Sequence, residues 1–387
     1  MEQKRILFDI RPLKERELTG IGWYTYHLLH ALANIDRNNS YILYDFFLPS
    51  HTKYCRELSR KIPIAENFTL SCSRFPGKIM RRLQQCGISL ERFFGPFDIV
   101  HLPHCWPVYT KKGRYIVTIH DLTPIIEPAW HPYARGRTFR TYAPKVSKTA
   151  DHIITDSENT KYDIMRYLSV PEEKISAIPL GADSSYMPLT TITAADATLD
   201  RHDISKPYIL FVGTIEPRKN VSRLLQAFEM MRAKTKEKVQ LVIAGKKGWD
   251  WEKTFEIFTR LSPSTKENIK WLEYVPSEDL PLLYGAATIF VYPSLYEGFG
   301  LPVLEAMSCG VPVITSNISS LPEVAGNGAI LVHPYDISEL AKKMEEMLCD
   351  VDLNHHYREQ SLTQAKKFSW HKTAKKTFAL YTALLQN

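Results

Sequence analysis

Short apolar runs alternate with amphipathic stretches along nearly the whole chain. Runs of roughly four to eight apolar residues bounded by turn residues indicate buried strands, whereas apolar positions at helical spacing indicate helices. In the first half, helices are predicted from Trp23 to Asn34 and from the N-cap Ser157 to Leu168. The strands predicted there are Ile6–Ile10, Tyr41–Phe47, Ile99–Leu102, Tyr115–Ile119, His152–Thr155 and Ile175–Ile178. This alternation predicts parallel sheets connected by crossover helices.

The same design begins again after a polar stretch. The periodic pattern fades between Gly181 and Lys206, and the apolar run Tyr208–Val212 opens a second series. Its helix is predicted at Val221–Met231, and its later strands at Val239–Ala244, Trp271–Tyr274, Ala287–Tyr292, Val313–Thr315 and Ala329–Val332.

We therefore predict an α/β protein with two doubly wound domains, which suits a chain of 387 residues. The expected boundaries are residues 1–190 for the first domain, 191–206 for a linker and 207–368 for the second domain. An amphipathic helix is expected at residues 369–387. The carboxyl ends of parallel strands form the binding edge in such domains, so two consecutive domains are expected to bind a ligand across a cleft.

Composition is that of an ordinary globular protein, with 44% hydrophobic and 24% charged residues. No apolar run approaches the roughly 20 residues of a membrane-spanning helix, and the N-terminal stretch lacks the apolar core of a signal peptide. The six cysteines show no paired spacing, which indicates buried free thiols in a reducing compartment. We expect a cytoplasmic protein.

The excess positive charge lies in the first half of the chain. Residues 1–190 hold 26 Lys and Arg against 19 Asp and Glu, a net of +7, whereas residues 191–387 hold 23 of each. These basic residues form a solvated face, or they attract an anionic acceptor or anionic lipid headgroups at the inner face of the plasma membrane. Nucleic acid is disfavoured, since no zinc spacing, recognition helix or RNA motif is present. The basic clusters are Arg74, Lys78, Arg81 and Arg82, and Arg135, Arg137, Arg140, Lys145 and Lys148.

The segment from Glu297 to Glu305 carries the most specific signal. A turn containing Gly298 and Gly300 follows a predicted strand, and Leu301–Ser308 predicts the start of a helix. Backbone amides at such a turn suit phosphate or sugar oxygens, and a carboxylate can accept two hydrogen bonds from a ribose diol. Glutamates are also common in first helical turns for their effect on the helix dipole alone.

A second strand-to-helix loop runs from Gly213 to Asn220. Arg218 and Lys219 in this loop offer a guanidinium fork and a point charge, which together suit a diphosphate. Adjacent basic residues in a loop are otherwise often idle and exposed. No Asp-x-Asp pair that would mark a metal-held diphosphate accompanies these loops.

Two features of the first half follow predicted strands. Gly20-Ile-Gly22 lies between the first strand and the first helix, where glycine permits close approach of the backbone to a ligand, although a plain tight turn is the commoner explanation of such a pair. Thr25 breaks the full Gly-x-Gly-x-x-Gly, which argues against a dinucleotide fingerprint. His120 ends the strand Tyr115–Ile119 and so lies at a binding edge.

The motifs Glu297-Gly-Phe-Gly-Leu-Pro and Glu305-Ala-Met-Ser-Cys-Gly-Val-Pro-Val-Ile-Thr-Ser closely resemble the signature of family 4 glycosyltransferases. The resemblance covers nearly the whole chain and is strongest from Tyr208 to Pro334. It implies the GT-B fold, in which two Rossmann-like domains face each other across a cleft and the C-terminal helix crosses back to the first domain.

The resemblance also implies roles for single residues. Glu297 would lie by the donor sugar, Glu305 would bind the ribose, and Arg218 and Lys219 would bind the diphosphate. Catalysis would involve His120, Glu297, Arg218 and Lys219. The donor site would further include Gly22, Gly213, Val275 in the base pocket, and the backbone amides of Phe299, Gly300 and Leu301.

The implied activity is retaining, metal-independent transfer of a hexose from a nucleotide diphosphate sugar to a glycan or lipid-linked acceptor. Gly20-Ile-Gly-Trp-Tyr-Thr25 and Val117-Thr-Ile-His-Asp-Leu122 are most similar to bacterial mannosyltransferases of polysaccharide and O-antigen assembly, which favours GDP-mannose. A sugar-nucleotide 2-epimerase of the same fold remains an alternative, as does a non-catalytic partner subunit. The sequence leaves the acceptor, the linkage and the oligomeric state open.

Overall fold

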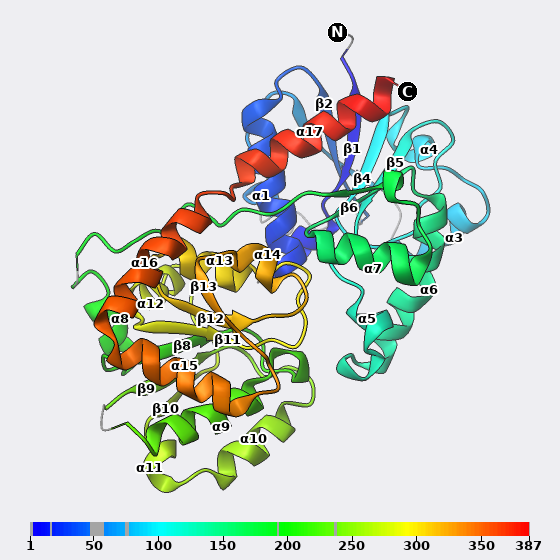
Figure 1. The fold of residues 1–387 in the computed structure, drawn as a ribbon. Coiled ribbons are helices and arrows are strands. Elements are labelled where there is room, and N and C mark those ends of the chain that lie inside the picture. The colour runs from blue at the N-terminus through cyan, green and yellow to red at the C-terminus, as the bar shows by residue number, and fades with distance from the viewer. Residues whose placement is uncertain are drawn as a thin grey trace. The chain divides into compact units, whose positions relative to one another are not determined.

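The computed structural model describes residues 3–15, 18–46, 58–73, 77–191, 193–235 and 238–386. The chain divides into two compact units (Figure 1). Unit 1 comprises Met1–Ile126, Tyr133–Leu180 and Ser369–Asn387, and unit 2 comprises Glu127–Pro132 and Gly181–Phe368.

These units differ in detail from the expected domains. Unit 1 ends at Leu180 rather than at residue 190, and the short segment Glu127–Pro132 groups with unit 2, where the Trp249 indole N–H donates to the Trp130 carbonyl. The expected linker contains a helix, α8 (Asp196–Arg201). Just after α8, His202 Nε2 lies 2.9 Å from Asp279 Oδ2, so this stretch is anchored to unit 2.

Unit 1 is built on a sheet of seven parallel strands in the order β3-β2-β1-β4-β5-β6-β7. The strands are β1 (Arg5–Asp9), β2 (Ser40–Phe46), β3 (Phe68–Ser73), β4 (Ile99–Leu102), β5 (Arg114–Thr118), β6 (His152–Thr155) and β7 (Ile175–Ala177). All six predicted strands are confirmed, and β3, an edge strand, was missed because its sequence mixes polar and apolar residues.

Helices lie on both sides of this sheet (Figure 1). They are α1 (Gly20–Ile35), α3 (Gly77–Gln85), α4 (Glu91–Phe94), α5 (Thr123–Ile126), α6 (Tyr133–Thr149), α7 (Glu158–Leu168) and α17 (Trp370–Gln386), with short 3-10 turns η1 (Arg11–Lys14) and η3 (Glu172–Lys174). The predicted N-cap of α7 is confirmed, since the Ser157 side chain accepts from the Thr160 amide. The C-terminal helix α17 packs on α1, as the family resemblance implied, and the Trp370 ring stacks on His27 at 5.0 Å.

Gly22 does not lie in a loop ahead of the first helix, as we expected, because α1 already begins at Gly20. A Cβ at Gly22 would lie 3.0 Å from Leu18 Cδ2 and 3.2 Å from the Pro12 carbonyl oxygen. The absence of a side chain there thus lets the preceding loop pack tightly on the first helical turn.

Unit 2 has a sheet of six parallel strands in the order β10-β9-β8-β11-β12-β13. The strands are β8 (Tyr208–Val212), β9 (Gln240–Ala244), β10 (Ile269–Leu272), β11 (Ile289–Tyr292), β12 (Val313–Ser316) and β13 (Ala329–Val332). Those predictions are confirmed, except that β10 ends at Leu272, before the predicted Tyr274. Val275 therefore lies in the loop beyond the strand.

The helices of unit 2 also cover both faces of its sheet, with α12, α13, α14 and α16 on one side and α9, α10, α11 and α15 on the other (Figure 1). Their bounds are η2 (Pro128–Trp130), η4 (Pro217–Lys219), α9 (Val221–Arg232), α10 (Trp251–Arg260), α11 (Pro263–Lys266), α12 (Leu280–Ala286), α13 (Leu301–Ser308), α14 (Leu321–Ala325), α15 (Ile337–Cys349) and α16 (Val351–Ala365).

Both sheets reverse their strand order at one point, between β1 and β4 in unit 1 and between β8 and β11 in unit 2. The chain leaves the two strands that flank such a switch point in opposite directions, so a crevice opens at their carboxyl ends. In unit 2 the loops that follow β8 and β11 are the two segments that the sequence singled out. The topology alone thus brings residues 213–220 and 293–300 to one edge.

Buried strands explain why the sequence pattern was readable. Every residue of β11, and all of β8 but its last, is fully buried, which accounts for continuous apolar runs rather than alternation.

The thiols of Cys86, Cys105, Cys309 and Cys349 are free, but Cys86 and Cys349 are exposed, contrary to the expectation of burial. Cys55, Arg74, and the side chains of Cys72, Lys78, Arg81 and Arg135 lie outside the described residues. Among the helices described, none is both long and apolar enough to cross a membrane.

Replacement of Gly245 by alanine should destabilise unit 2. A Cβ there would lie 1.9 Å from the Gly213 carbonyl oxygen, so the backbone after β8 or β9 would have to move. We expect a loss of about 1–3 kcal/mol in the free energy of unfolding, measured by urea denaturation. Gly20→Ala is the matched control, since nothing lies within 4 Å of its Cβ position. Equal stability of the two variants would contradict the close approach.

Candidate active site

The loop after β8 is held in place by Asn220. This residue has a left-handed backbone (φ 59°) between η4 and α9, a conformation that asparagine tolerates. Its side-chain amide donates to the carbonyl oxygens of Pro293, at 2.9 Å, and Pro334, at 2.7 Å. Three strand-end loops of unit 2 are thereby joined, and Arg218 and Lys219 are fixed at the carboxyl edge of the sheet.

The loop after β11 is fixed by serines that follow β12. Ser320 Oγ donates to the carbonyl oxygens of Glu297 and Phe299, both at 2.9 Å, and the Glu297 amide donates to Ser319 Oγ at 3.0 Å. Gly300, with φ 109°, ends the turn as the N-cap of α13, a conformation that a side chain would strain. Hydrogen bonds at both its amide and its carbonyl oxygen therefore fix the backbone of Glu297, independently of its side chain.

The Glu297 carboxylate is the centre of a buried ion cluster. Its Oε1 accepts from Lys219 Nζ at 2.6 Å, from the Tyr292 hydroxyl at 2.9 Å and from Ser294 Oγ at 2.5 Å. Its Oε2 accepts from Arg218 Nη1 at 2.7 Å. Glu297 is 6% and Lys219 8% exposed, so the charges interact with little screening by water. We call Glu216, Arg218, Lys219, Tyr292, Ser294 and Glu297 the Glu297 cluster.

Arg218 is shared between two carboxylates. Its Nη2 lies 2.9 Å from Glu216 Oε1, and its Nη1 also donates to the Tyr296 carbonyl at 2.8 Å. Burial alone would raise the pKa of Glu297, but the neighbouring Arg218 and Lys219 outweigh it and lower the pKa to about 2. Burial lowers the pKa of Lys219 and raises that of Glu216. Glu297 is therefore ionised at neutral pH.

The second glutamate of the motif has a different environment. Glu305, on α13, is half-buried, and its Oε2 accepts from the Tyr284 hydroxyl at 3.0 Å. Burial raises the pKa of Glu305 to about 7, so its carboxyl group is only partly ionised at neutral pH. Among the described residues, Glu305 makes no hydrogen bond or ion pair with the Glu297 cluster, so the two glutamates lie in separate polar settings.

The other residues of unit 2 that we predicted for the donor site lie after β8, β10 and β11. The Phe299 side chain is buried and packs on Phe368 at 5.8 Å, so only its backbone faces the turn. No described residue accepts a hydrogen bond from the amides of Phe299, Gly300 or Leu301, which leaves them able to bind a ligand. Gly213 directly follows β8, and Val275 is half-buried in the loop after β10.

A cavity of about 190 Å³ opens beside the ends of β9 and β10. Two tryptophans and a phenylalanine give it apolar walls, and Lys247 and Glu273, which are 2.9 Å apart, form its charged rim. The Trp271 indole N–H is buried without a hydrogen-bond partner among the described residues. The lining residues are Ile215, Gly245, Lys247, Trp251, Thr254, Phe255, Trp271, Leu272 and Glu273.

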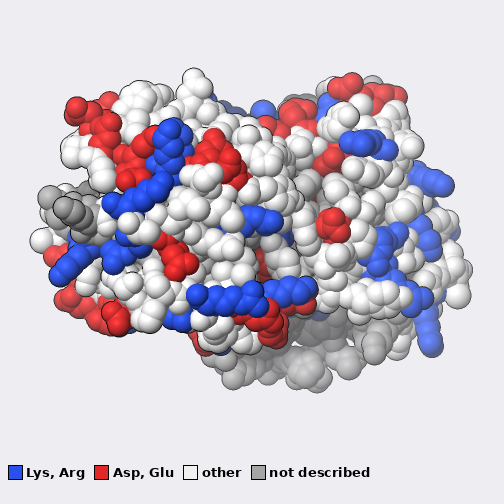
Figure 2. Space-filling model, turned by 60° about the horizontal axis from the view of Figure 1, so that its bottom comes forward, with Lys and Arg blue, Asp and Glu red and all other residues white. Residues whose placement is uncertain are grey.

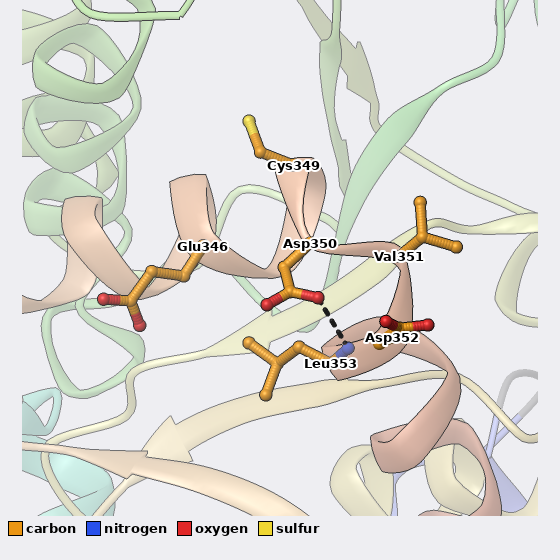
Figure 3. A pocket seen from close by; sticks show the side chains of 6 residues that line it. All are labelled: Glu346, Cys349, Asp350, Val351, Asp352 and Leu353. Carbon is orange, nitrogen blue, oxygen red and sulfur yellow. Dashed lines mark hydrogen bonds between the residues drawn. The ribbon is translucent and has the colours of Figure 1, made fainter.

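A larger cavity, of about 690 Å³, lies at the junction of α15 and α16 and has a different character (Figure 3). Glu346, Asp350 and Asp352 line it without any Lys or Arg, so it would repel a diphosphate. Asp350 and Asp352 form an Asp-x-Asp that our expectation of no metal site did not consider. Asp350 accepts from the Leu353 amide at 2.9 Å and caps α16. Within the described ranges no group of three His, Cys, Asp or Glu residues is placed to hold a metal ion.

The two site residues predicted in the first half belong to unit 1. Gly22 lies in the first turn of α1. His120 follows β5, with Nδ1 at 2.6 Å from Asp156 Oδ2 and Nε2 at 3.0 Å from the Pro103 carbonyl oxygen. Burial alone would lower the pKa of His120, but the Asp156 carboxylate raises it above its ordinary value.

Sequence reasoning brought together Arg218, Lys219 and Glu297, but it missed the groups that hold them. Glu216 lies in the same motif and could have been noticed as a carboxylate two positions before Arg218. Tyr292 was counted as the last residue of an apolar strand, although its hydroxyl lies at the strand end. Asp156 gave no signal, because it meets His120 only through the pairing of β5 and β6.

Comparison with known proteins identifies the family. The model described as glycosyl transferases group 1 matches residues 200–364, and glycosyltransferase family 4 matches residues 18–186. The O-antigen chain mannosyltransferase B of Escherichia coli is 32% identical over 395 residues, which cover 98% of this chain and 100% of that protein. This chain belongs to the group 1 glycosyltransferases.

Other matches agree with this glycosyltransferase assignment. The serotype-specific mannosyltransferase WbdA of Escherichia coli is 30% identical over 288 residues, 73% of this chain and 35% of that protein. The structure of sucrose-phosphate synthase from Thermosynechococcus elongatus has a TM-score of 0.77 at 19% identity, covering 99% of this chain and 100% of that one. These findings confirm the GT-B fold with two Rossmann-like units, and the transferase class that the sequence motifs implied.

The Glu297 cluster should make the free energy of unfolding depend on pH in the acidic range. Because the Glu297 pKa is lowered from 4.5 to about 2, its ionised form stabilises the folded glycosyltransferase above the unfolded pKa. That contribution, up to about 3 kcal/mol, is lost as pH falls from about 5 toward 2.

Glu297→Gln should therefore be destabilised relative to wild type near pH 7, and the difference should shrink toward pH 3. Calorimetric unfolding across this range measures it. Glu278→Gln, at an exposed carboxylate of unit 2, is the control and should show little difference at any pH. A Glu297→Gln deficit that is independent of pH would contradict the ion cluster.

Proposed function

We propose that this glycosyltransferase transfers mannose from GDP-mannose, with retention, to a glycan or lipid-linked acceptor of polysaccharide assembly. The observation that carries the proposal is the Glu297 cluster, in which two fixed cations and a buried carboxylate lie at the switch point of unit 2. The full-length relative named an O-antigen chain mannosyltransferase supports the choice of sugar and acceptor class.

The cluster suits the departure of a nucleoside diphosphate. Negative charge develops on the leaving phosphate as the glycosidic bond breaks, and cations that are already in place stabilise this charge without reorganisation. Arg218 and Lys219 are held by Glu216, Tyr292 and Glu297, so little freedom remains to be lost on binding. We propose that they perform this task without a metal ion or other cofactor.

The hydrogen bonds and the pKa of Glu297 argue against retention through a covalent glycosyl-enzyme intermediate. Its two oxygens accept four hydrogen bonds, and its pKa of about 2 marks a weakly basic carboxylate. A nucleophilic carboxylate must instead lie free and close to the anomeric carbon. We therefore favour attack of the acceptor hydroxyl on the face from which the diphosphate leaves, with the leaving phosphate accepting the proton.

The apolar cavity beside β9 and β10 is the proposed site of the nucleobase, together with the backbone of Val275. Aromatic walls suit a planar base. The Glu273 carboxylate on its rim can accept from the exocyclic amine of guanine, a donor that uracil and thymine lack. This supports GDP-mannose over UDP- and dTDP-sugars.

The test of the function is a donor screen followed by transfer. Thermal shift with GDP-, UDP-, dTDP- and ADP-sugars should show the largest stabilisation with GDP-mannose. Transfer to a lipid-linked acceptor, followed by mass spectrometry and anomeric NMR, should give an α-retained product in the presence of EDTA. Epimerisation of a sugar nucleotide without acceptor would instead support the 2-epimerase, and absence of binding to every sugar nucleotide would overturn the proposal.

Lys219→Ala should reduce transfer by about 100-fold or more while unit 2 stays folded, because a cation at the leaving diphosphate is lost. Steady-state kinetics and circular dichroism measure the two effects. Lys253→Ala is the matched control, since this exposed lysine of α10 pairs only with Asp250 at 3.1 Å among the described residues. Near-normal turnover of Lys219→Ala would contradict the assignment.

Nucleotide affinity should fall as pH drops through about 7. Glu305 is the proposed ribose ligand, and its pKa of about 7 means that the accepting carboxylate form is lost below that pH. Calorimetric titration with GDP between about pH 6 and pH 8 should show weakening on the acid side. Glu305→Gln should bind weakly with a much flatter profile, and an unchanged pH dependence in that variant would exclude Glu305 as its source.

We further propose that the enzyme acts in the cytoplasm and contacts anionic lipid at the membrane surface through α6. Arg137, Lys145 and Lys148 on this helix are exposed, and so is Tyr133 at its start. Basic and acidic side chains are interspersed on the face seen in Figure 2, so we assign the contact to one helix rather than to a broad positive surface.

Flotation with liposomes containing phosphatidylglycerol should recover the wild type at low salt. Replacement of Arg137, Lys145 and Lys148 by Ala should reduce the recovered fraction, because each basic residue near the surface contributes about 1 kcal/mol. The matched triple variant Lys234, Lys253 and Lys266 to Ala in unit 2 should float like wild type. A recovered fraction that depends on neither the lipid charge nor the salt concentration would contradict this contact.

A further inference from the structure

The His120 ring in unit 1 is bound at both of its nitrogens. Nε2 lies 3.0 Å from the Pro103 carbonyl oxygen, which can only accept, so Nε2 must carry a proton. Nδ1 lies 2.6 Å from Asp156 Oδ2. With Nε2 protonated, a neutral ring would turn the lone pair of Nδ1 toward an ionised carboxylate, which is repulsive. The contact is attractive only if a second proton lies between Nδ1 and Oδ2.

The described residues indicate no other role for Asp156 than its contact with His120. It follows β6 and is 3% exposed, and its Oδ1 is buried without a hydrogen-bond partner among the described residues. A buried carboxylate is costly unless its charge is balanced. The only cation that it contacts in the described parts of the chain is His120.

The other titratable groups around the ring do not take the place of Asp156. The Tyr24 ring meets His120 edge-on at 4.8 Å, but its hydroxyl bonds Thr118 Oγ1 at 2.9 Å. Asp121 Oδ1 accepts from the amide and hydroxyl of Thr123. His101 is buried and His104 partly buried near the ring, and desolvation lowers the pKa of both, so they add no positive charge at neutral pH.

We propose that Asp156 is a positioning residue that holds His120 as a doubly protonated imidazolium at the carboxyl edge of the first sheet. The ring then supplies a fixed positive charge rather than a general base, since neither nitrogen keeps a free lone pair. A diphosphate is the part of the donor that such a charge favours. The kinetic consequence rests on the proposed function, whereas the charge state of the ring does not.

Asp156→Asn separates charge from geometry. The asparagine amide is similar in size and can donate to Nδ1, so a neutral ring with Nε2–H still directed at Pro103 satisfies all partners. In ¹⁵N and ¹³C NMR spectra, with the His120 signals assigned by comparison with His120→Gln, the wild type should show an imidazolium at about pH 7.5, above the ordinary histidine pKa of about 6.5. Asp156→Asn should show a neutral imidazole at that pH.

The control variant is Asp121→Asn. This residue adjoins His120 in sequence but bonds Thr123 instead of the ring, so its His120 signals should remain those of an imidazolium. In transfer assays Asp156→Asn should lose about 10- to 100-fold in kcat near pH 7.5, with the deficit shrinking at lower pH as the ring regains its proton.

A neutral His120 in the wild type at about pH 6.5 to 7.5 would overturn the proposal. So would an Asp156→Asn variant whose His120 spectrum and pH–rate profile match the wild type. If the protein proves to transfer no sugar, the NMR comparison still decides the charge state, so failure of the proposed function and failure of this inference are distinguishable.

Discussion

The contact between the Glu297 carboxylate and the two cations Arg218 and Lys219 is the interaction on which unit 2 depends. Two cations and two carboxylates are largely removed from water there, which is tolerable only because each is paired with an opposite charge. Glu297 accepts four hydrogen bonds, and Glu216 balances the remaining positive charge. The cluster fixes the loops after β8 and β11 in one arrangement, because Glu297 after β11 pairs with both Arg218 and Lys219 after β8.

The sheet topology explains why these charges meet. β8 and β11 are neighbours at the switch point, so loops about eighty positions apart in sequence begin side by side. Asn220 and the serines after β12 then hold these loops by their backbone atoms. Unit 1 repeats the principle with different chemistry, since His120 after β5 and Asp156 after β6 form a buried pair on adjacent strands. In both units a buried carboxylate pairs with a cationic side chain that belongs to a family motif.

Much of the fold could be predicted because buried parallel strands appear as continuous apolar runs. β8 and β13 were predicted with their observed bounds, and the Glu297 segment was placed correctly between β11 and α13. The edge strand β3 was missed, since its sequence mixes polar and apolar residues. β10 was placed too late, because Tyr274 has the residue type of a strand but lies in the exposed loop beyond it.

Only those residues of the site that lie in short sequence motifs could be predicted. Arg218, Lys219 and Glu297 belong to short motifs, whereas Tyr292 and Asp156 act through pairings that the sequence does not display. Gly22 was assigned to a loop because a glycine pair resembles a turn, although α1 already begins at Gly20. Charge states were equally hidden, since burial and partners separate the pKa of Glu297 from that of Glu305 by about five units.

The place of α17 in unit 1 has a consequence for biosynthesis. Tyr381 is buried, and its hydroxyl lies 2.5 Å from Nδ1 of His101, which lies in β4 at the centre of the first sheet. Residues of α17, which are synthesised after unit 2, thus complete the core of the unit whose strands are translated first. Unit 2 can finish folding while the first sheet still exposes the apolar surface that α17 covers. A nascent chain would therefore need protection of its N-terminal half until α17 has been synthesised, and loss of α17 would harm strands that lie far from it in sequence.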